Sequence, residues 1–237
     1  MPLDEIKALT FDVFGTVVDW RGTIVSEGSR MNRERGWDVD WAAFADAWRA
    51  LYQPSMSEVR DGQRSWTRLD NLHRESLDTL IPQFGLDGLD AVACEHLNRV
   101  WHRLHPWPDA VTGLSRLKTR FVLATLSNGN IALLVNMAKH ANLPWDAILG
   151  AEIAGHYKPQ AEAYLKTADA LGLQPDECLM VAAHNSDLVT AGGLGFRTAF
   201  VARPTEYGPS QTTDLSTERN FDIVAEDFNA LATTLGC

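Results

Sequence analysis

Asp12 is the residue with the clearest chemical potential. It follows a largely apolar run at residues 6–11, and Val13, Phe14, Gly15 and Thr16 come directly after it. The run predicts a short buried strand, followed by a sharp turn. Open α/β sheets place their active sites at the carboxyl ends of strands, so Asp12 is a candidate functional residue. The hydroxyl of Thr16 could bond this aspartate, the substrate or the backbone of the turn.

Polar side chains follow other predicted strands as well. Ser127 and Asn128 come after an apolar run at residues 120–126. A serine that ends a strand and opens a helix presents a hydroxyl and free N–H groups, which suit a small carboxylate. The alternative is a helix cap. Lys158 precedes a predicted helix, where its charge would keep Asp12 ionised or be solvated at the surface.

These segments, in their order along the chain, resemble the four motifs of the haloacid dehalogenase superfamily. The resemblance implies that Asp12 is a covalent nucleophile. Phosphatases of the superfamily carry a general-acid aspartate two residues later, where this chain has Phe14. A phosphatase expels an alkoxide, which needs a proton, whereas a halide leaves without one. Phe14 would also dry the site and make the carboxylate a better nucleophile. The first motif therefore resembles the L-2-haloacid dehalogenase branch.

That branch implies roles for the other motif residues. Ser127 and Asn128 would hold the substrate carboxylate, Tyr164 would be a positioning group, and Asp187 would pair with Lys158 or orient a water molecule. The chain departs from its better-known relatives at Ala182 and His184, where they have Ser and Asn. His184 could be a water-activating base or a neutral hydrogen-bonding substitute for Asn. The sequence leaves both roles open.

Residues 21–105 are predicted to form an all-helical cap of the C1 type, inserted into a core of residues 1–20 and 106–237. Apolar residues such as Phe44, Trp48, Leu72 and Leu80 recur there at helical spacing. Trp48 and Arg49 resemble the Trp-Arg pair of the dehalogenases, whose arginine approaches the halogen. A guanidinium could stabilise the departing halide, although Arg49 could equally be a solvated helix residue. Phe14 and Trp48 are candidates for an apolar wall of the site.

After residue 105 the pattern alternates between strands and helices, which predicts a doubly wound parallel sheet. Strands are expected at 120–126, 147–151, 178–183 and 198–202, with another beginning at 223. Helices are expected at 131–141, 159–171 and 225–235.

Composition narrows the function classes. The chain has 237 residues, of which 45% are hydrophobic, and its net charge of −10 argues against binding nucleic acid or an anionic membrane. We see no apolar run of the roughly 18–20 residues that span a membrane, and no signal peptide. Three cysteines without metal-like spacing look like reduced thiols of a cytoplasmic protein.

The sequence therefore predicts a hydrolase that converts small 2-haloalkanoic acids, such as chloroacetate or L-2-chloropropionate, to 2-hydroxy acids through an Asp12 ester. No metal or organic cofactor is implied, and the partners are the haloacid and the halide ion. One alternative is a Mg²⁺-dependent small-molecule phosphatase of the same superfamily, and another is a catalytically silent binding protein. Homodimers are common among relatives, but no residue indicates one here.

Overall fold

A six-stranded parallel sheet forms the centre of the computed structural model, which describes residues 5–237. Its strands lie in the order β5-β4-β1-β6-β7-β8, and each neighbouring pair is parallel. The strands are β1 (Ala8–Phe11), β4 (Val122–Ser127), β5 (Ala147–Gly150), β6 (Cys178–Ala182), β7 (Arg197–Val201) and β8 (Ile223–Ala225). The predicted doubly wound α/β fold is confirmed.

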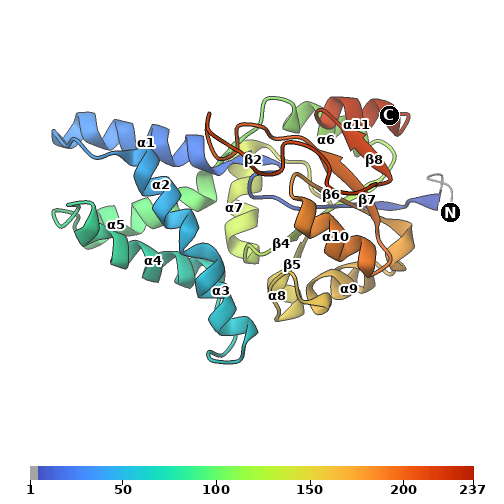
Figure 1. Ribbon diagram of the computed structural model, residues 1–237, viewed down its shortest axis with the longest axis horizontal. Coiled ribbons are helices and arrows are strands. Elements are labelled where there is room, and N and C mark those ends of the chain that lie inside the picture. The colour runs from blue at the N-terminus through green and yellow to red at the C-terminus, as the bar shows by residue number, and fades with distance from the viewer. Residues whose placement is uncertain (1–4) are drawn as a thin grey trace.

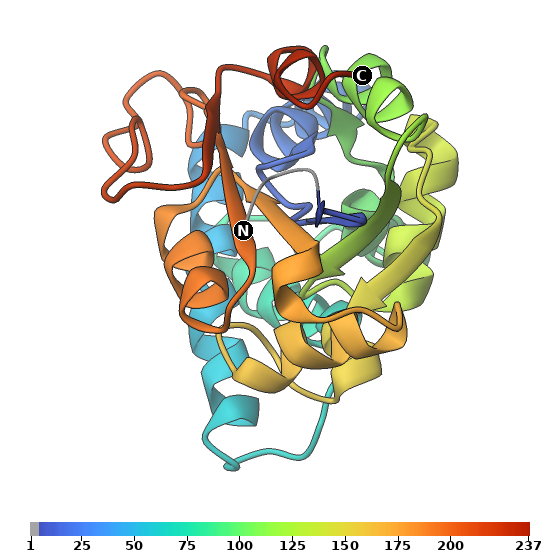
Figure 2. The same ribbon diagram turned by 90° about the vertical axis from the view of Figure 1, so that its right-hand side faces the viewer.

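Both faces of the sheet are buried, which explains why its strands are continuous apolar runs. Successive residues of β6 alternate between two apolar clusters. Leu179 and Val181 belong to the cluster that contains Phe228, whereas Met180 belongs to the one that contains Tyr164. Helices lie on both sides of the sheet (Figures 1 and 2): α6 (Ala110–Leu117) packs with α11 (Phe228–Thr234), and α9 (Ala161–Ala170) and α10 (Asn185–Gly193) lie on the opposite side.

Two helices at the strand ends complete the core. They are α7 (Ile131–Ala141), which follows β4, and the short α8 (Ala151–Ala154), which follows β5. Most predicted bounds are correct to within two residues, and three differences bear on the site or on the helices. Ser127 is the last residue of β4 instead of the first residue of a turn, α9 begins at Ala161 instead of Pro159, and α11 begins at Phe228 instead of Ala225.

The chain between the two short antiparallel strands β2 (Val18–Asp19) and β3 (His105–Pro106) is helical and lies to one side of the sheet (Figure 1). It contains α1 (Trp20–Arg35), α2 (Trp41–Ala50), α3 (Tyr52–Arg60), α4 (Leu69–Gln83), α5 (Ala91–Asn98) and the 3₁₀ helix η2 (Arg99–Arg103). Asp19, Asp40 and Asp90 cap α1, α2 and α5 by accepting backbone N–H groups.

Helix α2 turns one apolar stripe inward, because Trp41, Phe44, Ala45 and Trp48 are buried at helical spacing. This packing leaves Arg49, the residue after Trp48, on the side of α2 that faces the carboxyl ends of the sheet strands.

Candidate functional site

A cavity of about 430 Å³ lies where the carboxyl ends of the central strands meet the helical insertion. Asp12 and Phe14 enter it from the turn after β1, and Asn128 from the turn after β4. Arg49 and Tyr52 line it from the insertion. In this sheet the strand order reverses at β1, which is the point where open α/β folds bind ligands.

Asp12 is buried, and both of its carboxylate oxygens have partners. Oδ1 accepts a hydrogen bond from Nζ of Lys158 at 2.9 Å, and Oδ2 accepts one from the Thr16 hydroxyl at 2.7 Å. Nδ1 of His184 lies 3.2 Å from Oδ2. Burial by itself would raise the pKa of Asp12, but the Lys158 charge and the His184 contact outweigh it and hold the pKa well below its usual range. Asp12 is therefore ionised at neutral pH.

The Thr16 hydroxyl also serves the backbone of a neighbouring strand. It accepts the N–H of Ala183, just after β6, at 2.9 Å while it donates to Asp12. Two of the roles that the sequence left open, a bond to Asp12 and a bond to the backbone, are thus combined in one hydroxyl. The hydroxyl proton is donated to Asp12, while one lone pair of the same oxygen accepts the Ala183 N–H.

Lys158 is shared between two carboxylates. Besides Asp12 it contacts Oδ2 of Asp187, and Oδ1 of Asp187 accepts the Tyr164 hydroxyl at 2.6 Å. Burial would lower the pKa of Lys158, but the charges of Asp12 and then Asp187 raise it above its usual value. The backbone N–H of Lys158 donates to Oδ1 of Asn128 at 2.8 Å, which ties the lysine to the end of β4.

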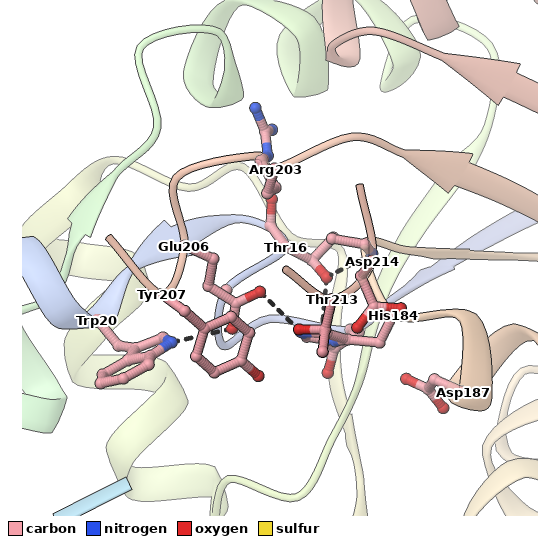
Figure 3. Close-up of polar contacts among 12 residues, drawn as sticks. Thr16, Trp20, His184, Asp187, Arg203, Glu206, Tyr207, Thr213 and Asp214 are labelled. Atoms are coloured by element: carbon pink, nitrogen blue, oxygen red, sulfur yellow. Dashed lines mark hydrogen bonds and ion pairs between the residues drawn. The ribbon is translucent and has the colours of Figure 1, made fainter. Parts of the chain in front are cut away.

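His184 lies between two carboxylates, and Figure 3 shows the second of them, Glu206. Nε2 of the ring is 2.8 Å from Oε2 of Glu206, on the side away from Asp12. Burial would lower the pKa of His184, but the Glu206 charge, followed by the contacts with Asp12, raises it well above its usual value.

Arg49 lines the cavity from α2 and has a buried donor without a partner among the described residues. Its guanidinium stacks over the ring of Tyr52 at 4.2 Å and over that of Trp20 at 5.4 Å, and within residues 5–237 its buried Nη1 has no hydrogen-bond partner. A second cavity of about 450 Å³ is also lined by Arg49 and Tyr52, so the arginine lies between the two. A buried guanidinium nitrogen without a partner is costly, so an anion that reached Nη1 would be stabilised there.

Three of the expected substrate-binding residues, Thr16, Ser127 and Trp48, do not line the cavity. Ser127 is fully buried, and its hydroxyl oxygen accepts the N–H of Gly129 at 3.1 Å. Trp48 is buried against Trp101, whose ring in turn contacts Phe14, and the Trp48 indole donates to the backbone oxygen of His73. Phe14, Asn128 and Tyr164 do line the cavity.

The sequence reasoning missed Glu206, Tyr52, Tyr207, Asp214 and Arg60, although all but Glu206 line the cavity and Glu206 contacts His184. Glu206 and Tyr207 lie in the loop after β7, which ends at the same sheet edge as β1 and β6. Their place directly after a predicted strand could have identified them from the sequence, because polar residues after any strand of a parallel sheet can reach the site.

Two features are absent from the described residues, 5–237. No three or more His, Cys, Asp or Glu side chains among them are grouped so that they could hold a metal ion. None of their helices has the length and apolar character needed to cross a membrane.

Comparisons with known proteins agree with this geometry. A model of the haloacid dehalogenase-like hydrolase family matches residues 6–183. Two solved structures are each 46% identical to this chain, cover 98% of it and have TM-scores of 0.95. One is an L-2-haloacid dehalogenase of which 99% is covered, and the other is a defluorinating L-2-haloacid dehalogenase of which 96% is covered. The (S)-2-haloacid dehalogenase 4A of Burkholderia cepacia is 28% identical over 219 residues, which cover 86% of this chain and 88% of that protein. The chain belongs to the haloacid dehalogenase-like hydrolase family, in its L-2-haloacid dehalogenase branch.

Proposed function

We propose that the protein hydrolyses small 2-haloalkanoic acids, such as chloroacetate or L-2-chloropropionate, to 2-hydroxy acids through an ester of Asp12. One observation carries the proposal. An ionised strand-end carboxylate faces the cavity beside Phe14, at the position where a phosphatase would need an acid. A halide leaves without protonation, so a site without that acid suits a carbon–halogen bond. The two relatives at 46% identity are named for this activity.

The hydrogen bonds of Asp12 indicate which oxygen attacks. Among the described residues, Oδ2 already has two partners, Thr16 and His184, whereas Oδ1 has only Lys158. Each carboxylate oxygen can accept about two hydrogen bonds, so a lone pair of Oδ1 is free. We infer that Oδ1 forms the bond to C2 while the carbon–halogen bond breaks and the halide leaves with both electrons.

Hydrolysis of the ester then restores Asp12. Water attacks Cγ of the aspartate, and the bond between Cγ and the ester oxygen breaks. One water proton ends on the oxygen that stays on C2, and the second is released as the carboxylate reforms. Asp187 lines the cavity beside Lys158, and we propose that it orients this water molecule.

We propose binding roles for the remaining residues. Arg49 would contact the leaving halide through its guanidinium, and Asn128 and Tyr164 would face the substrate from the core side of the cavity. Trp48 and Ser127 would act indirectly, by fixing the aromatic layer behind Phe14 and the turn after β4. We propose that the helical insertion, residues 21–105, serves as the cap.

Two further proposals concern the setting of the enzyme. Cys94, Cys178 and Cys237 form no disulfide, which fits a reducing compartment such as the cytoplasm. A homodimer stays a prediction, and the molar mass in solution would test it.

The first test measures halide release in the presence of EDTA. We expect the protein to release halide from chloroacetate with EDTA present and to leave a generic phosphate ester intact, with fluoroacetate as a further substrate. Turnover that stops with EDTA and returns with Mg²⁺, alongside phosphate release, would support a phosphatase.

Single turnover in ¹⁸O-water should put the label in Asp12 and not in the first-formed hydroxy acid. Label that appears at once in the product would show that water attacks C2 directly.

Arg49 provides a second test. Arg49→Ala is expected to lower kcat for halide release by about 10²–10³-fold, because one preorganised electrostatic donor is lost. Arg49→Lys should recover only part of this, since it keeps the charge but not the planar fork that stacks on Tyr52. Arg60→Ala is a matched control, because Arg60 lines the same cavity but bonds the backbone oxygen of Lys158. Near-normal halide release by Arg49→Ala would remove the arginine from the mechanism.

A further inference from the structure

Both ring nitrogens of His184 face carboxylate oxygens. Nδ1 is 3.2 Å from Oδ2 of Asp12, and Nε2 is 2.8 Å from Oε2 of Glu206. An ionised carboxylate can only accept hydrogen bonds, so both nitrogens must carry protons for both contacts to be favourable. The two contacts together therefore favour an imidazolium, which differs from both roles that the sequence left open.

Glu206 is held in place from three sides. It is 1% exposed, its Oε1 accepts the indole N–H of Trp20 at 2.9 Å, and its carboxylate lies directly over Gly15. Gly15 has φ +85°, and a Cβ added there would lie 2.0 Å from Oε1 of Glu206. The glycine beside the nucleophile thus permits the turn and leaves room for this carboxylate.

The loop that carries Glu206 is also anchored. Nε of Arg203 donates to the backbone oxygen of Thr16 at 2.9 Å, and its two terminal nitrogens each bond a carboxylate oxygen of Asp109 at 2.8 Å. The backbone N–H of Glu206 donates to the backbone carbonyl of Arg203 at 3.2 Å. The bidentate pair with Asp109 holds Arg203 in place, and the Arg203 bond to Thr16 ties the Glu206 loop to the turn after β1.

We propose that Glu206 is a positioning residue that keeps His184 a cation, so that His184 and Thr16 together form an oxyanion site for Oδ2 of the Asp12 ester. This inference rests on the proposed function. When water attacks Cγ, the electron pair of the carbonyl bond moves onto Oδ2, which already faces the Thr16 hydroxyl and Nδ1 of His184. When the intermediate collapses, that pair reforms the carbonyl bond and the ester oxygen leaves with the product. His184 keeps both protons throughout.

The need for Glu206 follows from what esterification does to Asp12. Alkylation removes the negative charge of Asp12, so one of the two carboxylates beside the ring is lost when the oxyanion must be stabilised. Glu206 still pairs with Nε2 and keeps the ring charged. Hydrogen bonds from a charged donor are about twice as strong as neutral ones.

Other charges face the same region. Lys158 contacts the far oxygen of Asp12, Asp187 and Asp214 line the cavity, and Arg49 enters it from α2. Only Asp12 and Glu206 contact the ring of His184 as ion-pair partners among the described residues. The charge of Glu206 also contributes most to the raised pKa of His184.

The test is Glu206→Gln, which keeps the shape and the hydrogen bond to Trp20 but removes the charge. We expect one halide per site to be released in a burst at the wild-type rate, followed by steady-state turnover that is slower on the order of 10²-fold. The ester should then accumulate on Asp12, where mass spectrometry of the intact protein detects it. Exposed Glu226, mutated to Gln, is the matched control and should behave as wild type. The burst amplitude also reports that the variant is folded.

The pH dependence separates this role from general-base catalysis. Glu206→Gln removes the charge that raises the pKa of His184, so more neutral imidazole is present at pH 6. A base role would make the variant as fast as wild type there, or faster, whereas the cation role makes it slower. NMR of the His184 ring should show its pKa lowered in the variant, with His184→Asn used to assign the signal.

The results with Glu206→Gln and with the wild type test separate claims. Steady-state turnover that is unchanged, or a burst that slows along with it, would overturn the role of Glu206. Wild-type protein that releases no halide from chloroacetate would instead overturn the proposed function.

Discussion

Replacing Lys158 with Met is expected to abolish halide release and to lower the free energy of unfolding by about 3–5 kcal/mol, the scale found when one partner of a buried ion pair is removed. Lys158 is 8% exposed and contacts both Asp12 and Asp187. Without its charge, burial is less opposed and the pKa of Asp12 rises, which weakens the nucleophile. Urea denaturation at pH 7 and a halide assay measure the two effects.

The stability loss has a definite pH dependence. In the wild type the pKa of Asp12 is lowered by folding, so its ionised form contributes stability above its unfolded value of about 3.9, and this contribution is lost as the pH falls through the folded pKa. The difference between wild type and Lys158→Met should therefore be full at neutral pH and shrink in acid. A difference that grows in acid would contradict this assignment.

The double variant Lys158→Met/Asp187→Asn is the matched control. It removes one of the two carboxylates that the lysine neutralises, while the amide introduced in place of Asp187 can still accept the Tyr164 hydroxyl. It should regain part of the stability but none of the halide release, because Asp12 still lacks its cation. Substantial activity in either variant would show that Lys158 does not hold the nucleophile.

The core of the fold could be predicted because its strands are buried on both faces. An apolar run such as residues 178–183 is typical of a strand that is buried on both faces, and a polar motif follows it. Element ends were harder to place. Proline is favourable in the first turn of a helix, yet residues 157–160 form a turn closed by the N–H of Gln160 on the carbonyl of Tyr157, and α9 begins at Ala161. That turn depends on contacts with the end of β4, which are distant in sequence.

In the site, too, the residues that could not be predicted are those placed by contacts distant in sequence. Asp12, Lys158 and Asp187 each follow a recognisable element, so their meeting at one sheet edge could be expected. Glu206 lies in an irregular loop, and its partner Trp20 is 186 residues away. The sequence around His184 therefore could not decide between a base and a neutral donor, because the charge of the ring is set by this distant carboxylate.

Asp12→Asn is expected to lower halide release by about 10⁶-fold, the scale seen when an enzyme loses its covalent nucleophile. The amide has nearly the same shape as the carboxylate, so Thr16 and His184 should stay in place while the charge is lost. The lone pair of an amide nitrogen is delocalised into the carbonyl group, and the neutral amide oxygen is a much weaker nucleophile than a carboxylate. A coupled halide assay measures the loss, with Thr16→Ser as a control that keeps the hydroxyl.

The same variant mimics the charge of the ester, and so it tests whether His184 stays protonated when hydrolysis begins. Losing the Asp12 charge should lower the pKa of His184, but by less than Glu206→Gln does, because the Glu206 charge contributes more to raising it. NMR titration of the ring in both variants gives the order. If Asp12→Asn lowered this pKa more than Glu206→Gln, the charge of Asp12 would be the main reason that His184 stays protonated. Esterification would then cause His184 to lose a proton at the start of hydrolysis, and the neutral ring could act as a base.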